Sequence, residues 1–222
     1  MQKIINTLYQ KITELIFPKN QIEEIDNQIV AEMVRINRNE GDRFTTYPCP
    51  AYSFFQYRTP AVQNMIWKLK YHSNKPIAEF FAKTIYNIIC DELAELAQWS
   101  DFKNPILVAV PVSPRKLRLR GFNQSEAICK ALAGFDENRF FTHLPHVLYK
   151  IKDTKSQAKV KDKKTRLQNL KDSFAIKDNG LVQNRNIILL DDVLTTGATL
   201  TEATFVLKNA GAKNIIWVVV AH

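Results

Sequence analysis

Three short apolar runs constrain the fold of this chain more than any other feature. They are ILVAVPV at 106–112, NIILL at 186–190 and NIIWVVVA at 214–221. A continuous apolar run fits a strand that is covered on both faces, as strands of parallel sheets are. Helix-like stretches at 121–133 and 199–212 separate these runs, and Gly211 is placed to end the second of them. The pattern predicts an α/β fold with a mostly parallel sheet flanked by helices.

The chain is predicted to have two parts, which meet near residue 47. Residues 1–46 begin with a helix-compatible pattern that Pro18 stops, and a polar stretch follows. We expect this segment to be an N-terminal appendage of helical or irregular structure. Residues 47–222 are expected to form the main domain.

Three segments open the main domain. Residues 47–58, YPCPAYSFFQYR, are aromatic and predict an edge strand or a hairpin. Residues 61–71 predict a short helix that exposes Lys68 and Lys70. Residues 77–97 carry apolar side chains at helical spacing, which is typical of a helix that packs on the core.

The net charge of +9 is concentrated in two segments. Residues 150–171 hold nine Lys or Arg against two Asp, and RKLRLR at 115–120 adds four more positive charges. A short strand is predicted at 146–151, at the start of the first basic segment. Such a concentration indicates an anionic partner, either a phosphorylated metabolite or a nucleic acid. A solvated basic loop is the alternative for residues 150–171.

Several function classes are disfavoured by composition. Cys49, Cys90 and Cys129 lie far apart with no C-x-x-C pair, which argues against a zinc knuckle or a disulfide framework. No apolar run approaches the roughly 20 residues that span a bilayer. The N-terminus lacks the pattern of a signal peptide, so a cytoplasmic location is expected.

The segment IILLDDVLTTGAT at 187–199 carries the chemistry. Its two acids, Asp191 and Asp192, follow a buried strand, and ligands of parallel sheets bind beyond the carboxyl ends of the strands. The small residues 195–199 then open a helix, whose N-terminal N–H groups can hold a phosphate. Two carboxylates would repel that phosphate, so they are expected to face neutral hydroxyls or a divalent cation. A ribose 5-phosphate supplies both requirements. Neither a Walker loop nor a G-x-G-x-x-G fingerprint occurs.

This segment resembles the signature that binds 5-phosphoribosyl diphosphate (PRPP) in type I phosphoribosyltransferases. Residues 109–133, AVPVSPRKLRLRGFNQSEAICKALA, resemble the ComF group of that superfamily, as do residues 154–174 and 52–71. The resemblance covers roughly residues 47–221 and implies a type I phosphoribosyltransferase-like fold. ComF-like proteins are associated with natural competence, the uptake of DNA. The group usually opens with a four-cysteine zinc module, whose cysteines are missing here, so no structural zinc is expected.

The resemblance also implies roles for individual residues. The loop from Thr195 to Thr199 would bind the 5-phosphate, and the acids would bind the ribose hydroxyls directly or through Mg²⁺. The turn at 112–116 matches the pyrophosphate loop, and Arg118 and Arg120, placed on one side by their spacing, would clamp phosphate. The implied PRPP-binding residues are Val112, Ser113, Pro114, Arg118, Arg120, Thr154, Gln157, Asp191, Asp192, Val193, Leu194, Thr195, Thr196, Gly197, Ala198 and Thr199. The implied catalytic residues are Arg115, Lys116 and Lys152, and the implied metal ligands are Asp191 and Asp192.

The reaction implied is displacement of pyrophosphate at C1 of the ribose by an acceptor that the sequence does not identify. The basic segment would act as a mobile loop over the site, with Lys150, Lys152, Thr154 and Gln157 as candidates. Two alternatives to this reaction remain open, and the three readings are not exclusive. One is a PRPP- or nucleotide-sensing protein without turnover, and the other is a competence factor that binds single-stranded DNA.

Overall fold

The computed structural model describes residues 28, 29, 31, 32, 42–72, 74–152 and 170–222. The strands are β1 (Asp42–Phe44), β2 (Ala51–Phe55), β3 (Ile106–Ala109), β4 (Thr142–His143), β5 (Leu148–Lys150), β6 (Phe174–Ile176), β7 (Ile187–Val193) and β8 (Ile215–Ala221). The helices are α3 (Pro60–His72), α4 (Lys75–Trp99), α5 (Pro114–Arg120), α6 (Gln124–Phe135), the 3₁₀ helix η3 (Asn179–Leu181) and α8 (Ala198–Asn209).

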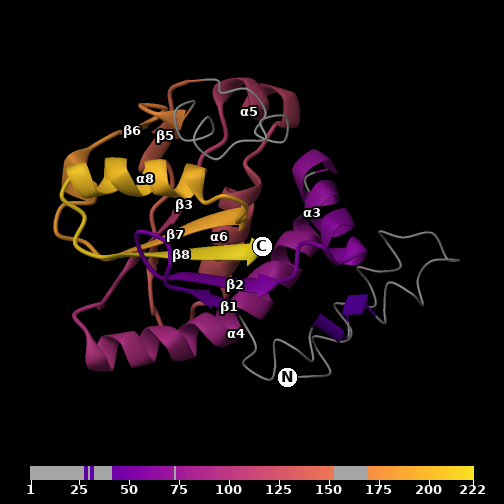
Figure 1. Ribbon diagram of the computed structural model, residues 1–222, viewed down its shortest axis with the longest axis horizontal. Coiled ribbons are helices and arrows are strands. Elements are labelled where there is room, and N and C mark those ends of the chain that lie inside the picture. Colours follow the sequence, from indigo (N-terminus) through magenta and orange to yellow (C-terminus); the bar gives the residue numbers. More distant parts are fainter. Residues whose placement is uncertain (1–27, 30, 33–41, 73, 153–169) are drawn as a thin grey trace, which may run out of the picture.

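Six strands form the main sheet, in the order β1-β2-β8-β7-β3-β4 (Figure 1). All neighbours run parallel except β1 and β2. The three apolar runs of the sequence form the adjacent strands β3, β7 and β8, and every residue of β3 and β8 is buried. The predicted α/β fold with a mostly parallel, helix-flanked sheet is therefore confirmed.

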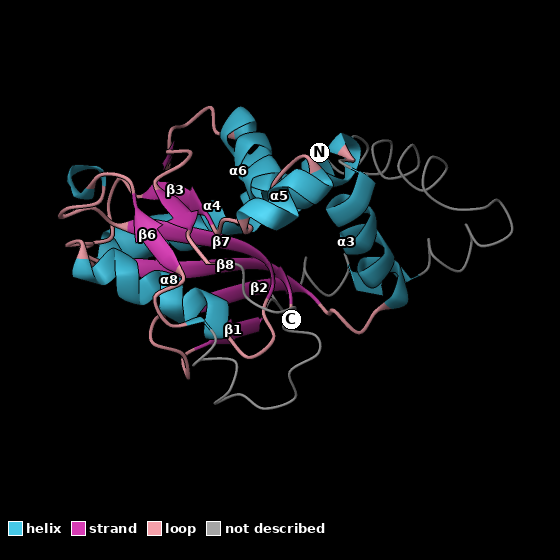
Figure 2. Ribbon diagram, turned by 90° about the horizontal axis from the view of Figure 1, so that it is seen from above, coloured by secondary structure: helices cyan, strands magenta, loops and turns pink. Residues whose placement is uncertain are grey.

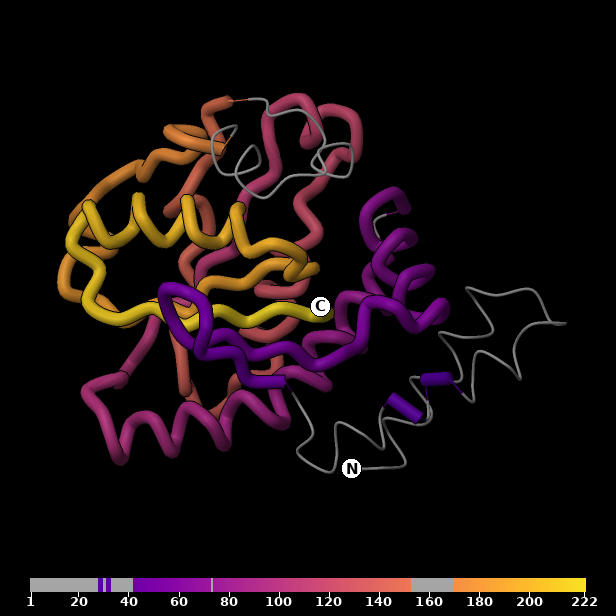
Figure 3. Tube along the Cα trace, in the orientation of Figure 1, coloured from indigo at the N-terminus to yellow at the C-terminus, as the bar shows by residue number. Residues whose placement is uncertain are grey.

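Helices cover both faces of this sheet (Figure 2). Because side chains alternate along a strand, Leu107 and Ile188 face α4 and α6, while Val108 and Leu189 face α8. Trp217 lies on the α8 side, where its indole Nε1 donates a hydrogen bond to Thr204 Oγ1 at 2.8 Å. The chain trace in Figure 3 shows β7 and β8 ending on the side where α3 rises.

Several boundaries differ from the sequence-based expectation. β2 is an interior strand, because β1 pairs with it and takes the edge. The predicted strand at 146–151 pairs antiparallel with β6 in a separate two-stranded sheet. The predicted strand at 186–190 continues as β7 to Val193, since its main-chain pairing with β8 continues through Asp191. The helices predicted at 61–71 and 77–97 are confirmed as α3 and α4.

The structure also shows contacts that cross the expected boundary at residue 47. Strand β1 lies before it and belongs to the sheet. Ile29 is 1% exposed and joins the core on the α4 side. The Glu32 carboxylate accepts hydrogen bonds from Thr59 Oγ1 at 2.6 Å and from the Gln56 N–H at 3.2 Å. These contacts anchor the turn that leads into α3. Most of residues 1–46 lies outside the described residues.

Over the described ranges, no helix is long and apolar enough to cross a bilayer.

Candidate functional site

A pocket opens where β3 and β7 lie side by side. After β3 the chain passes through α5 and then enters α6 on one face of the sheet, and after β7 it enters α8 on the other. Such a switch point leaves a crevice at the carboxyl ends of the strands, where ligands bind in open α/β sheets. The pocket has a volume of about 430 Å³. Its lining is Tyr57, Gln63, Ile66, Trp67, Lys70, Tyr71, Val110, Pro111, Val112, Ser113, Lys116, Arg120, Gln124, Lys150, Asp191, Asp192, Val193, Thr195 and Thr199.

The two acids form the floor of this pocket, and donors from two helices hold them. Gln124 Nε2 donates to Asp192 Oδ2 at 3.1 Å, and Ser125 Oγ donates to Asp191 Oδ1 at 3.1 Å. The ammonium of Lys70, on α3, lies 2.8 Å from the same Asp192 Oδ2. The acid pair and the side chains that hold it thus come from three segments that are distant in sequence.

The start of α6 explains why its donors reach the acids. Asn123 is the N-cap residue, and its side chain accepts a hydrogen bond from the Ser125 N–H. The same side chain donates to the Val110 carbonyl at 3.0 Å, just beyond β3. This clamp fixes the first turn of α6 against the sheet, so that Gln124 and Ser125 are buried and aimed at the acids.

The acid pair perturbs the protonation of Asp191. Burial of its carboxylate, together with the negative charge of Asp192, raises the pKa of Asp191 to about 7. A carboxyl whose pKa is higher in the folded than in the unfolded protein stabilises the fold at pH values below the unfolded pKa. That stabilisation is lost as the pH rises through the folded pKa. Near neutral pH, Asp191 is therefore partly protonated in the free protein.

The variant Asp191→Asn tests this shift. The gap in melting temperature between the variant and the protein should be smaller at pH 5 than at pH 8, because folded Asp191 is protonated at pH 5 although the unfolded chain has already lost most of that proton. At pH 8 the variant should melt several degrees higher, because it carries no buried charge; about 2–4 °C per kcal/mol is typical for this size. Thermal unfolding from pH 5 to 8 measures the difference. A constant offset between the two proteins over that range would contradict the shift.

A cationic wall lines the same pocket as the acids. Lys116 and Arg120 on α5 and Lys150 on β5 line it. Burial and the nearby charges of Arg120 and Lys70 lower the pKa of Lys116. Gathering like charges costs free energy unless an anion binds among them, so this wall is suited to a phosphate or pyrophosphate.

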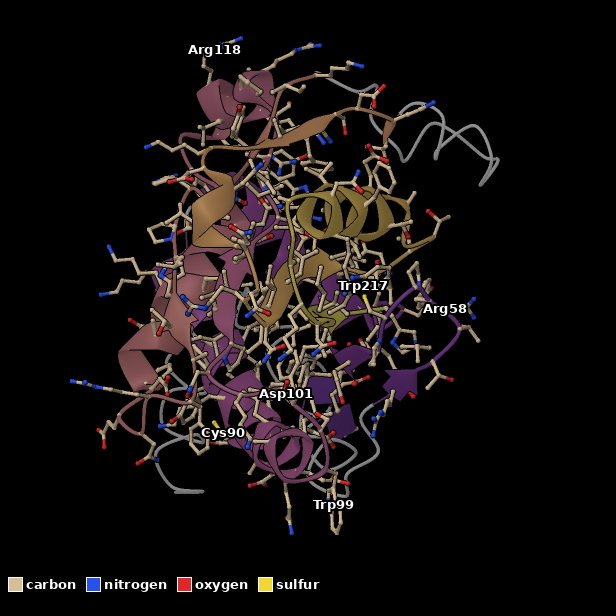
Figure 4. The ribbon with its side chains drawn as sticks, turned by 90° about the vertical axis from the view of Figure 1, so that its left-hand side faces the viewer. Arg58, Cys90, Trp99, Asp101, Arg118 and Trp217 are labelled. Carbon is tan, nitrogen blue, oxygen red and sulfur yellow. The ribbon has the colours of Figure 1, made fainter. Side chains whose placement is uncertain are left out.

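The pocket includes one of the two arginines expected to act together. The segment RKLRLR forms helix α5, where residues two apart lie about 200° apart around the axis. The expectation that Arg118 and Arg120 share a side is therefore wrong. Arg120 lines the pocket and its Nη1 donates to Gln124 Oε1 at 3.2 Å, whereas Arg118 projects outward (Figure 4).

The loop after the acids enters α8 as the sequence predicts. Thr195 and Thr199 line the pocket. Gly197 is the N-cap residue, in a left-handed conformation with φ of 73°, and has no side chain to cap the helix. The Ala198 N–H donates a long hydrogen bond of 3.5 Å to Thr196 Oγ1. The first N–H groups of α8 are thus suited to an anion.

Some of the predicted site residues line the pocket and others do not. Asp191, Asp192, Val193, Thr195, Thr199, Val112, Ser113, Lys116, Arg120 and Lys150 line the pocket. Pro114, Arg115, Arg118, Lys152, Leu194, Thr196, Gly197 and Ala198 do not, and Lys152 lies 4.0 Å from Asp172 instead. Thr154 and Gln157 lie outside the described residues.

Sequence reasoning missed the contribution of α3. Gln63, Ile66, Trp67, Lys70 and Tyr71 line the pocket at helical spacing. The expectation that Lys70 is exposed is wrong, since 23% of its side chain is accessible and it pairs with Asp192. The available signal was a lysine on the same helical face as Trp67 and Tyr71. Gln124 and Ser125 were also missed, although they sit in the segment that resembles the ComF group.

The acid pair fits Mg²⁺, which keeps few protein ligands and takes most of its oxygens from substrate and water. Within the described ranges, no group of three or more His, Cys, Asp or Glu side chains forms a metal site. Asp191 and Asp192 are the two carboxylates that would hold such an ion at the pocket floor.

Comparison with known proteins extends this description. A model of the phosphoribosyl transferase domain matches residues 140–222. The DNA utilization protein YhgH of Salmonella typhimurium is 27% identical over 161 residues, which are 72% of this chain and 66% of that protein. Competence protein ComFC of Streptococcus pneumoniae is 30% identical over 139 residues, 62% of this chain and 54% of the relative. The matched regions span just under two thirds of the first relative and about half of the second.

A solved structure of hypoxanthine phosphoribosyltransferase from Trypanosoma cruzi is also similar. It is 11% identical, the match covers 65% of this chain and 64% of that one, and the TM-score is 0.39.

Proposed function

Because this chain is a ComF-family protein with a type I phosphoribosyltransferase-like fold, we propose that its pocket binds PRPP with Mg²⁺ and transfers the phosphoribosyl group to an acceptor, releasing pyrophosphate. One observation carries the proposal. An acid pair, the N-terminus of α8 with its glycine N-cap, and a cationic wall meet in a single pocket of about 430 Å³. These three features match the hydroxyls, the 5-phosphate and the pyrophosphate of one molecule.

Each part of the ligand has a matching part of the pocket. The N–H groups at the start of α8 and the hydroxyls of Thr195 and Thr199 suit the 5-phosphate. Asp191 and Asp192 suit the ribose hydroxyls, as acceptors. When bound, Mg²⁺ would neutralise charge between the hydroxyls and the pyrophosphate.

The chemical step needs mainly positioning and charge stabilisation. The bond from C1 of the ribose to the pyrophosphate oxygen breaks with its electron pair leaving on that oxygen, and a bond from C1 to the acceptor forms. Lys116 and Arg120 stabilise the charge that develops on the departing pyrophosphate. Holding the ribose on the acid pair keeps C1 oriented toward the acceptor. The proton of the acceptor leaves to solvent, since no side chain is assigned as its base.

A second candidate function follows from the relatives named for competence and DNA utilization. Arg115 and Arg118 lie exposed on α5 outside the pocket, where they can contact a phosphate backbone. Contacts of this kind would make single-strand binding strongly salt-dependent. Because α5 also contributes Lys116 and Arg120 to the pocket, one protein can serve both ligands, as a DNA-handling factor with a nucleotide site.

Calorimetric titration of PRPP, with and without Mg²⁺, tests the first function. We expect saturable binding that needs Mg²⁺ and is lost in Asp191→Ala/Asp192→Ala. A matched control replaces another adjacent acid pair, Asp91→Ala/Glu92→Ala on α4, which lies outside the pocket and should leave binding unchanged. Absence of PRPP binding to the unaltered protein in both conditions would refute the proposal, and single-stranded DNA would be the next ligand to titrate.

A further inference from the structure

The base of α3 is held by side chains from the N-terminal part of the chain. The first N–H groups of a helix have no acceptor within the helix. Pro60, the first residue of α3, has no N–H at all, so Ala61 carries the first free one. This N–H donates a hydrogen bond to Gln28 Oε1 at 3.1 Å. Gln28 therefore caps α3 from a distant part of the sequence.

Glu32 makes a second contact at the same place, and its side chain is buried, with 6% exposed. One carboxylate oxygen accepts a hydrogen bond from Thr59 Oγ1 at 2.6 Å, a distance typical of a hydroxyl that donates to a carboxylate. The other oxygen accepts from the Gln56 N–H at 3.2 Å. Thr59 directly precedes α3, and its carbonyl accepts from the Gln63 N–H in the first turn. Glu32 thus fixes the direction in which α3 leaves the turn.

An apolar contact accompanies the two polar ones. Residues 28, 29, 31 and 32 are helical, so positions 28, 29 and 32 fall on one side of a helical turn. Ile29 is 1% exposed and belongs to the same core cluster as the buried face of α3, which consists of Ala61, Val62, Met65, Ile66 and Leu69. The N-terminal segment therefore packs as one unit against the base of α3.

The far end of α3 carries the group that depends on this base. Lys70 comes 11 residues after Thr59, about 16 Å further along the helix axis. Its ammonium lies 2.8 Å from Asp192 Oδ2. A tilt of α3 by about 10° at its base would move this end by roughly 3 Å, which is enough to separate the ion pair. Since α3 stands away from the sheet (Figures 1 and 3), its direction depends on its base and its buried face.

We propose that Gln28 and Glu32 are positioning residues, which hold α3 at the angle that brings Lys70 against Asp192. Neither of them lines the pocket. The ion pair is a property of the free protein, so this positioning needs no ligand. The consequence for ligand affinity rests on the proposed function. If the acid pair holds the ribose, displacement of Lys70 changes the charge and orientation of that pair, and PRPP binds more weakly.

A double-mutant cycle in urea tests the positioning without ligand. Glu32→Ala removes the acceptors at the base of α3, and Lys70→Met removes the ammonium at its far end. Residues this far apart normally have additive effects on stability. We expect instead that Lys70→Met lowers the midpoint of urea unfolding in the unaltered protein but changes it little in Glu32→Ala, because Lys70 has already left Asp192. Glu32→Gln should retain the full effect of Lys70→Met. Its amide can accept from the Gln56 N–H and donate to the Thr59 hydroxyl.

Asn186→Ala is the matched structural control. Asn186 is also 6% exposed, and its side chain donates to the carbonyls of Asp101 and Lys103 at 2.8 and 2.9 Å. It precedes β7, at the end of that strand away from the pocket. Lys70→Met should therefore lower the midpoint of Asn186→Ala as much as that of the unaltered protein. Additive effects of Lys70→Met in Glu32→Ala as well would overturn the proposal. If Glu32→Ala does not fold, Gln28→Ala, which removes only the cap, takes its place in the cycle and should also reduce the effect of Lys70→Met.

Calorimetric titration of PRPP with Mg²⁺ measures the consequence for the pocket. Glu32→Ala should weaken binding at least about tenfold, because small displacements of positioning groups are costly. Glu32→Gln and Asn186→Ala should keep the affinity of the unaltered protein. Coupling in urea without a loss of affinity would overturn the link from α3 to the ligand. If the unaltered protein does not bind PRPP, the proposed function fails, and the urea cycle still decides whether Gln28 and Glu32 position α3.

Discussion

Replacing Lys70 by methionine should destabilise the protein by about 2–3 kcal/mol, because the Asp192 carboxylate then keeps Gln124 as a donor but loses the ammonium in contact with it. Asp192 is 6% exposed, and its Oδ2 contacts Lys70 at 2.8 Å and Gln124 at 3.1 Å. Burial alone would lower the pKa of Lys70, but the charges of Asp192 and Asp191 outweigh it and raise that pKa. Methionine keeps the length and packing of the side chain, so the change isolates the charge. Urea denaturation at pH 7.5 measures the loss.

A double-mutant cycle separates the ion pair from packing. Lys70→Met/Asp192→Asn removes both charges and should recover much of the stability lost in Lys70→Met. The control Lys75→Met removes one partner of an exposed pair with Glu79, 3.5 Å apart, where about 0.3–0.5 kcal/mol is at stake. Equal effects at Lys70 and Lys75 would mean that Asp192 is solvated in the free protein and does not depend on Lys70.

The substitution Gly197→Ala should cost still more, about 2–5 kcal/mol. The φ of 73° is a left-handed conformation that costs other residues about 1–2 kcal/mol. An added Cβ would also lie 2.6 Å from Cε1 and 2.9 Å from Cδ1 of Tyr47, so the ring must move. Overpacking of this kind adds about 1–3 kcal/mol. Because Gly197 begins α8, the variant should also bind PRPP more weakly. Thermal unfolding and calorimetry measure the two effects.

Gly121 provides the matched control for this prediction. Its φ of 77° is nearly the same, but a Cβ added there would meet nothing within 4 Å. Gly121→Ala should therefore cost only the conformational part, about 1–2 kcal/mol. Adding Tyr47→Ala to Gly197→Ala should relieve the clash. If the two glycine variants lose the same stability, Tyr47 is not the obstacle and only the backbone conformation matters.

Much of the fold could be predicted from local patterns. The runs at 106–112, 186–190 and 214–221 became neighbouring strands, because a wholly apolar strand is stable only between two covered faces. The helical stripe at 77–97 was equally predictable, since its period of 3.6 residues is a local property. Edge strand β1 was missed, because its three residues carry no pattern strong enough to read.

The candidate site was likewise predictable only in part. Asp191, Asp192 and the loop that follows were readable, because the chemistry and the strand–loop–helix context are contiguous in sequence. The pairing of Arg118 with Arg120 was wrong, because the spacing was read as extended chain and the segment folded as a helix. Lys70 was placed in solvent, because sequence periodicity does not tell which partner a helix face will meet.

By itself, the sequence determined the central strands, the long helices, the acid pair and the small-residue loop after it, because each depends on residues within one or two turns of chain. Only the tertiary structure decided that α3 carries Lys70, Trp67 and Tyr71 to a loop more than 120 residues away. It also decided that Gln124 and Ser125 meet the acids across the β3–β7 switch point. Contacts of this kind depend on how helices pack on the two faces of the sheet, and no local pattern encodes that packing.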